Sequence, residues 1–177
     1  MKIRFVSEKE KSVDEEIIDK IRNNEKCRML KEESLNSLIS DFRNLQKFSK
    51  EEKKLNNFGG YILSGFWLIK KSFFTFDFFN TSDICWVYIK QTKQSVNFVP
   101  VGTTYQIILN MRSGKELAKM INEKDQQYMM EFVHKNAPWA AFGFSEELKQ
   151  MWRKKKREFI SLVEKRYDDF VKNTSKK

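Results

Sequence analysis

A single histidine, His134, limits the acid–base chemistry that this 177-residue chain could perform. No Ser or Cys motif accompanies it, so a nucleophile and its base cannot be assembled from the sequence. The two cysteines, Cys27 and Cys85, stand far apart and lack the ligand spacing of a zinc site. The six glycines match neither a phosphate-binding loop nor a dinucleotide fingerprint. We therefore expect a protein that is not an enzyme and that needs no metal ion or cofactor.

The strongest charged feature is a run of five cations at residues 153–157, in a chain with formal net charge +10. Such a run can bind an anionic partner, either nucleic acid or an acidic membrane surface. On a helix, however, consecutive residues point in directions about 100° apart, so one or two of them must turn inward. Their aliphatic stems would then lie on Trp152 or Phe159. A solvated helix surface is the simpler interpretation, and both stay open. The candidate contacts are Arg153, Lys154, Lys156 and Arg157.

Three aromatic side chains, Trp139, Phe142 and Phe144, form the most distinctive uncharged segment, with the sequence Trp-Ala-Ala-Phe-Gly-Phe. Aromatic residues dominate the energetics of protein interfaces, so the segment could be a docking patch. The same side chains could instead plug one end of a sheet. Lys70 and Lys71 form a smaller basic pair and are further candidate contacts for a partner.

The composition is that of a chain with a substantial core, because 40% of its residues are hydrophobic and 16 are Phe. Residues 1–11 lack the apolar segment of a signal peptide. The longest apolar stretch, residues 58–69, is much shorter than the roughly 20 residues that a membrane-crossing helix needs. We therefore expect a cytoplasmic protein with no transmembrane segment and with two reduced, buried thiols. The oligomeric state stays open.

The elements that must position these candidates begin with a helical N-terminal arm over residues 1–57. Ser12, with Glu15 three residues later, forms a capping box for a first helix. A second helix is expected over residues 31–48, where apolar side chains recur at helical spacing. The remaining residues, 58–177, would form the main domain.

A helix-free region follows, in which short apolar segments alternate with turn residues. This pattern predicts one curved antiparallel sheet of about six strands. A reversal is expected at residues 70–72, and a turn at residues 80–83. The predicted strands are residues 61–69, 73–79, 84–90, 95–101, 104–111 and 115–120.

Two helices should complete the domain. The first, over residues 122–136, would cap the sheet and end before Pro138, because the residue before proline is pushed out of the helical region. Ser145 is expected to cap one long C-terminal helix that runs to about residue 171, with Glu146 and Glu147 in its first turn. The expected fold class is therefore α+β.

Residues 59–138 resemble bacterial pleckstrin-homology-like domains. The similarity lies in the strand that begins Asp83-Ile84 and runs through an aromatic, in the Gly114-Lys115 hairpin, and in the helix after the last strand. The resemblance implies a half-barrel that binds proteins, peptides or lipid headgroups and performs no catalysis. Members that bind phosphoinositides place several cations after the first hairpin, whereas this chain has Thr75 and Asp77 there.

These observations favour a non-enzymatic, cytoplasmic protein-binding module. A small protein that neutralises a toxin or effector, as immunity proteins do, would be one concrete form of it. The alternative is an anionic-surface binder, for nucleic acid or acidic membrane, that uses the basic C-terminal helix.

Overall fold

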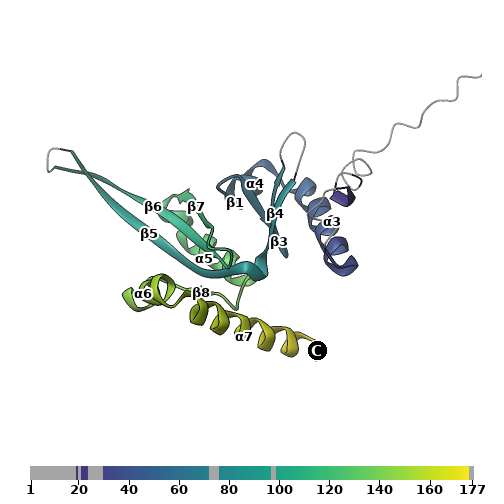
Figure 1. Ribbon diagram of the computed structural model, residues 1–177. Helices are drawn as coiled ribbons and strands as arrows, with labels where there is room; N and C mark the ends of the chain where they lie inside the picture. The colour runs from purple at the N-terminus through teal and green to yellow at the C-terminus, as the bar shows by residue number, and fades with distance from the viewer. Residues whose placement is uncertain (1–18, 20, 24–29, 72–75, 97–98, 176–177) are drawn as a thin grey trace, which may run out of the picture.

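The computed structural model describes residues 19, 21–23, 30–71, 76–96 and 99–175, and it confirms the α+β fold class (Figure 1). The predicted single sheet of six strands is wrong, because the strands form two separate four-stranded sheets that do not close into a barrel. The elements are α3 (Glu32–Lys47), α4 (Lys50–Leu55), β1 (Asn57–Phe58), β2 (Tyr61–Ser64), β3 (Trp67–Lys71), β4 (Phe76–Asn80), β5 (Ile84–Val96), β6 (Val99–Met111), β7 (Glu116–Ile121), α5 (Gln126–Asn136), β8 (Ala141–Phe142), α6 (Glu146–Lys154) and α7 (Lys156–Thr174).

The first sheet has the order β1-β2-β3-β4, and all its neighbours are antiparallel. The strand predicted over residues 61–69 is two strands, because the chain reverses at Gly65. β3 then continues through Lys71 and is antiparallel to β4, which begins at Phe76, so the reversal predicted at residues 70–72 lies after Lys71. Gly65 has φ +55°, and a Cβ there would lie 2.6 Å from Asp41 Oδ1. Asp41, which is buried in α3, accepts a hydrogen bond from Phe66 N at 2.6 Å. A carboxylate from the arm therefore fixes this turn.

Helix α3 confirms the helix predicted over residues 31–48 and covers the outer face of the first sheet. Its apolar stripe, including Leu38 and Phe42, packs with Trp67 and Ile69 of β3. Ile21 is buried in the same cluster, whereas the predicted Ser12 capping box lies outside the described residues. Cys27 lies outside them as well. The arm is thus packed onto the sheet through its own small core.

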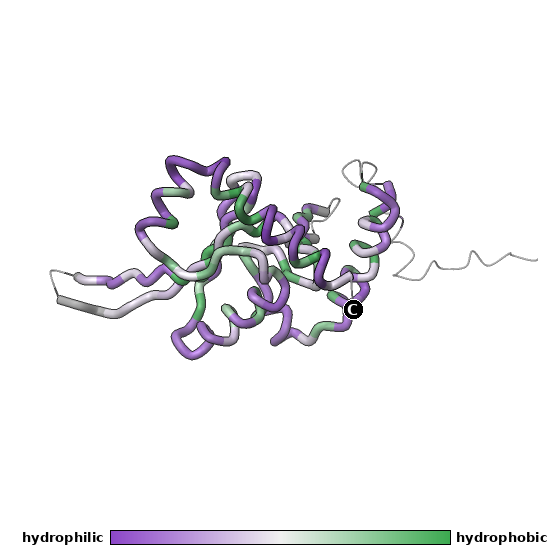
Figure 2. Tube along the Cα trace, turned by 90° about the horizontal axis from the view of Figure 1, so that it is seen from below, coloured by the Kyte–Doolittle hydropathy of each residue, from purple (hydrophilic) through white to green (hydrophobic). Residues whose placement is uncertain are grey.

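The main core lies between the two sheets and the C-terminal helices. Phe58 and Leu68 of the first sheet meet Val87 and Leu109 of the second there. Helix α5 contributes Met129 and Val133, and it ends just before Pro138 as predicted. Figure 2 shows hydrophobic residues concentrated in the centre of the molecule.

The second sheet has the order β7-β6-β5-β8, and β8 is parallel to β5. The segments predicted as three strands over residues 84–111 are two long strands, β5 and β6, which pair along their whole length. β7 reaches only as far as the pair Tyr105 and Ile121. Beyond the end of β7, β5 and β6 project as a two-stranded hairpin whose residues are mostly hydrophilic (Figures 1 and 2).

The C-terminal region departs from the prediction in two places. Residues 139–144 contain a short strand that was not predicted, because Ala141 and Phe142 pair with β5. Ser145 caps α6 as predicted and accepts a hydrogen bond from Leu148 N at 3.2 Å. The predicted single long helix is wrong, since the chain leaves helical geometry at Lys155, with φ −130° and ψ 42°. Helix α7 then runs beneath the second sheet to the C-terminus (Figure 1). No helix among the described residues is both long and apolar enough to span a bilayer.

Candidate functional site: an aromatic cleft beside β5

A cleft of about 590 Å³ lies between the second sheet and α6. Strand β5 supplies one wall, α6 supplies the other, and Phe144 lies between β8 and α6. β6 and β7 contribute one polar residue each. The lining residues are Trp86, Tyr88, Ile89, Lys90, Gln91, Asn110, Glu116, Phe144, Lys149, Trp152 and Arg153.

Four of the lining residues are aromatic and contact one another. The ring centroid of Trp86 lies 4.4 Å from that of Tyr88, 6.2 Å from that of Phe144 and 6.4 Å from that of Trp152. Trp86 is buried, and its Nε1 donates a hydrogen bond to Gly143 O at 2.7 Å. Phe144 is 52% exposed. The cleft thus has a rigid aromatic floor with one aromatic side chain available at its rim.

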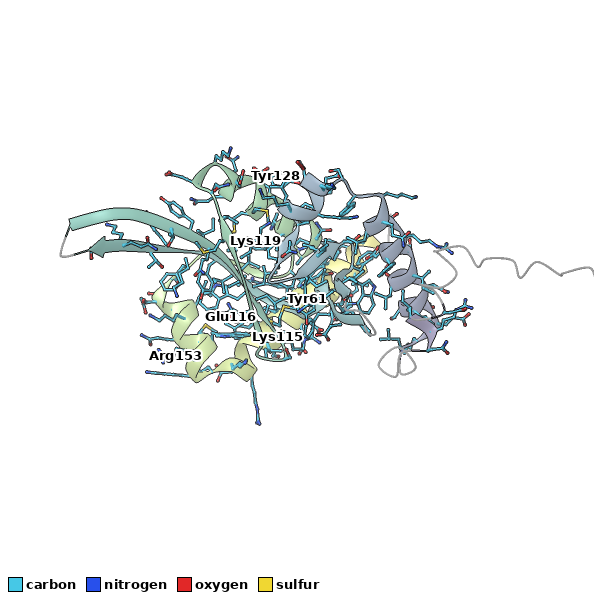
Figure 3. All side chains as sticks on the ribbon, turned by 90° about the horizontal axis from the view of Figure 1, so that it is seen from above. Tyr61, Lys115, Glu116, Lys119, Tyr128 and Arg153 are labelled. Atoms are coloured by element: carbon cyan, nitrogen blue, oxygen red, sulfur yellow. The ribbon has the colours of Figure 1, made fainter. Side chains whose placement is uncertain are left out.

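The rim of the cleft is predominantly basic. Lys149 pairs with Glu146 at 3.1 Å, and its Nζ lies 5.7 Å from the Phe144 ring centroid. Arg153 on α6 and Glu116 at the start of β7 lie on the same side of the molecule (Figure 3). Burial raises the pKa of Tyr88, and the charge of Glu116 adds to this shift, so the phenol stays protonated at neutral pH. Such a site can hold an apolar side chain and nearby anionic groups.

The basic run is divided by the break at Lys155. Lys156 turns inward, with its Nζ 4.6 Å from the Trp152 ring centroid. Lys155 pairs with Glu158 at 3.3 Å. The remaining cations of the run, Arg153, Lys154 and Arg157, are exposed. Only Arg153 among them lines the cleft.

The aromatic segment at residues 139–144 is divided as well. Trp139 is only 3% exposed, and its ring meets Tyr167 edge-on at 4.8 Å and lies 5.4 Å from Phe170. Phe142 packs edge-on with the exposed His134 at 4.9 Å. Only Phe144 reaches the cleft.

The remaining candidates lie on the first sheet. Lys70 is in β3, and its Nζ lies 5.7 Å from the ring centroid of Tyr61. Lys115 donates a hydrogen bond to the hydroxyl of Tyr61 at 2.9 Å. Tyr61 in turn donates to Asp77. For Lys71 the structure describes the backbone alone, which pairs with Phe76. The structure therefore does not bring Lys70 to the cleft.

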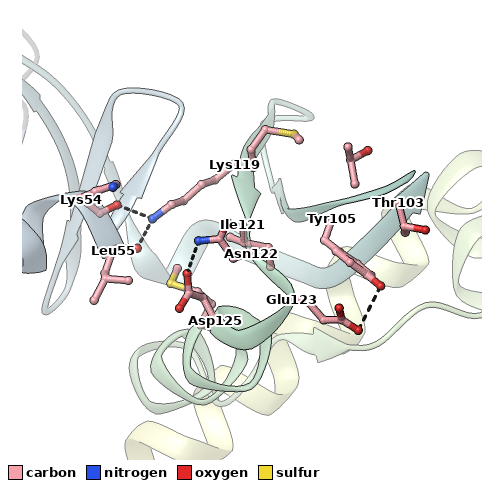
Figure 4. A pocket seen from close by; sticks show the side chains of 12 residues that line it. Lys54, Leu55, Thr103, Tyr105, Lys119, Ile121, Asn122, Glu123 and Asp125 are labelled. Atoms are coloured by element: carbon pink, nitrogen blue, oxygen red, sulfur yellow. Dashed lines mark hydrogen bonds between the residues drawn. The ribbon is translucent and has the colours of Figure 1, made fainter. Parts of the chain in front are cut away.

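A second pocket, of about 510 Å³, lies where α4 meets β7 (Figure 4). Lys119 Nζ donates to Lys54 O at 2.5 Å and also to Leu55 O, which are carbonyls at the end of α4. Burial lowers the pKa of Lys119. Because its amine is held by these backbone carbonyls, we assign Lys119 to joining α4 to the second sheet.

The cysteine that the structure describes, Cys85, is fully buried, and burial raises the pKa of its thiol to about 11. It is therefore protonated and unreactive at neutral pH. No group of three or more His, Cys, Asp or Glu side chains is placed to share a metal ion within the described part of the chain.

Comparison with known families adds one finding. The family model described as "Domain of unknown function (DUF6709)" matches residues 56–152, which is more than half of the chain. The chain belongs to this family. No curated protein and no solved structure matches it. The DUF6709 region starts at the end of α4 and stops within α6, so it includes every residue that lines the cleft except Arg153. The resemblance to pleckstrin-homology-like domains stays a prediction.

Sequence reasoning identified two cleft residues, Phe144 and Arg153, but placed them in separate candidate surfaces. It missed Tyr88 and Trp152 as site residues. Tyr88 follows Trp86 by two positions, which places both side chains on one face of a strand. Trp152 follows Lys149 by three positions, which places both on one face of α6. These spacings were visible, but nothing in the sequence showed that the two faces meet.

Proposed function

We propose that this protein is a non-enzymatic protein-binding module and that the cleft beside β5 is its contact surface. The observation that carries the proposal is the combination of four aromatic side chains with Arg153 in one open cleft. Tryptophan, tyrosine and arginine are the residue types most often found at the energetic centre of protein interfaces. Rings fixed by mutual packing also lose little conformational entropy when a partner binds.

A photo-crosslinking amino acid at position 144 is the direct test. It is expected to trap a specific protein in extracts of the native host, whereas the same amino acid at position 66 is not. Phe66 is a matched control because it is 60% exposed but lies on the turn between β2 and β3. Trp152→Ala should weaken capture at position 144 by about ten-fold, the effect of one hot-spot residue. Equal crosslinking at both positions would contradict the proposal.

Neutralisation of a toxin or effector is a special case of this proposal, and the identity of the trapped protein decides it. A secreted toxin or effector would support the special case. A housekeeping enzyme or a structural protein would leave the binding module intact but contradict neutralisation.

The second candidate function is binding of an anionic surface, and the exposure of Lys154 and Arg157 outside the cleft favours it. Replacing both by Gln should weaken binding to a DNA duplex in filter binding and should flatten its salt dependence by about two charges. Liposomes with acidic lipid test the membrane form by co-sedimentation. Absence of salt-dependent binding to either probe would contradict this function, and the double variant leaves the cleft residues unchanged.

A further inference from the structure

Strand β5 has an open edge inside the cleft. β8 pairs with β5 only at Trp86 and Val87, and the last bond is from Gly143 N to Val87 O at 2.9 Å. Gly143, with φ +88°, then turns the chain away into α6. From Tyr88 onward, no described residue pairs with β5 on this side.

The direction of the backbone groups follows from that last bond. Along a strand, the N–H and C=O of one residue point to the same side, and the side alternates with each residue. Because Val87 O faces β8, the N–H and C=O groups of Ile89, Gln91 and Lys93 face the open side. The cleft reaches this edge, since Ile89 and Gln91 line it as well as Tyr88 and Lys90. The cleft therefore extends from this edge over the face of the sheet that carries Trp86, Asn110 and Glu116.

The charges beside the open edge indicate what can fill it. Lys90, Lys149 and Arg153 line the cleft with one carboxylate, that of Glu116, and Lys149 is also paired with Glu146 just outside the lining. Lys93 follows on the same strand and is exposed. A second copy of this chain would bring its own Lys90 and Lys93 to the same edge, and like charges facing each other destabilise strand pairs. An acidic segment complements the edge.

We infer that the open edge of β5 takes up an extended, acidic segment of the partner protein as an added strand. This inference rests on the proposed function and specifies how the cleft would bind. The segment would continue the line of β8, exchange backbone hydrogen bonds with Ile89, Gln91 and Lys93, and place acidic side chains near Lys90 and Arg153. One apolar side chain would sit on the aromatic floor beside Phe144.

The test is a selection of random octapeptides displayed on phage against the full chain. The enriched peptides are expected to be acidic, and N-methylation of alternate peptide bonds should lower affinity by about ten-fold for one register only, because one set of N–H groups faces β5. An enriched pool that is not acidic would overturn the inference. So would equal effects of N-methylation in both registers.

A protein variant supplies the complementary measurement. Gln91→Pro removes an N–H that faces the open side, and proline is tolerated at such edge positions. It should abolish binding of the selected peptides, while Gln91→Ala should bind within about two-fold of the wild type because the contact is made by the backbone. Full binding by a folded Gln91→Pro variant would overturn the inference. A protein trapped at position 144 while the peptide tests fail would overturn strand addition alone and leave the proposed function standing.

Discussion

Trp139→Ala is expected to lower the free energy of unfolding by about 3–5 kcal/mol, the usual cost of truncating a large buried aromatic residue. Trp139 is 3% exposed and belongs to the main core. Its ring packs against Tyr167 and Phe170, so the substitution leaves a cavity between residues 139–144 and α7. Urea denaturation followed by circular dichroism measures the loss.

Phe144→Ala is the matched control, since it removes an aromatic side chain from the same segment. Phe144 is 52% exposed, and we expect its loss to cost about 1 kcal/mol or less. The two variants therefore distinguish the two interpretations of residues 139–144, a plug of the sheet and a docking patch. A large loss for Trp139→Ala alone supports the plug, whereas an unchanged stability with lost partner binding would support docking through Trp139.

The second large effect concerns pH and the buried carboxyl of Asp41. Burial raises its pKa from 3.8 to about 6, against the opposing effect of hydrogen bonds from the backbone of Phe66 and Trp67. The folded state therefore binds the proton more tightly than the unfolded state. The resulting stability is fully present below about pH 4 and is lost as the pH rises through about 6. Two pKa units correspond to a loss of up to about 3 kcal/mol.

Asp41→Asn isolates this contribution, because an amide oxygen can still accept the hydrogen bond from Phe66 N but the side chain does not titrate. The difference in unfolding free energy between wild type and Asp41→Asn should shift in favour of the variant between pH 4 and pH 7. Urea titrations at four pH values in this range measure it. A difference that is constant with pH, or that shifts toward the wild type, would contradict the prediction.

Local sequence signals predicted the parts of the fold that local physics decides. The apolar stripe of α3, the Ser145 cap and the end of α5 before Pro138 all depend on residues within a few positions of one another. The turn at Gly65 was missed because the carboxylate that fixes it belongs to Asp41, which is remote in sequence. The break at Lys155 has no local signal, since lysine is a good helix former.

The candidate site was less accessible to sequence reasoning, because two distant segments form it. The hydrogen bond from Trp86 to Gly143 spans 57 positions. β8 consists of two residues, too few for any alternation pattern to reveal. Phe144 and Arg153 were recognised by residue type, but their meeting with Tyr88 depends on this pairing.

The parallel pairing of β8 with β5 also has a consequence for the order of folding. The hairpins of both sheets connect neighbouring segments and can form early, whereas β8 and α7 must return to a strand completed long before them. Until then, Trp86 and the other apolar residues that α7 covers are not shielded by Phe159 and Val163. A ribosome-bound chain would therefore expose an apolar, aggregation-prone sheet until α7 has emerged. Residues 141–174 thus decide when the nascent protein stops exposing surface that can misassemble.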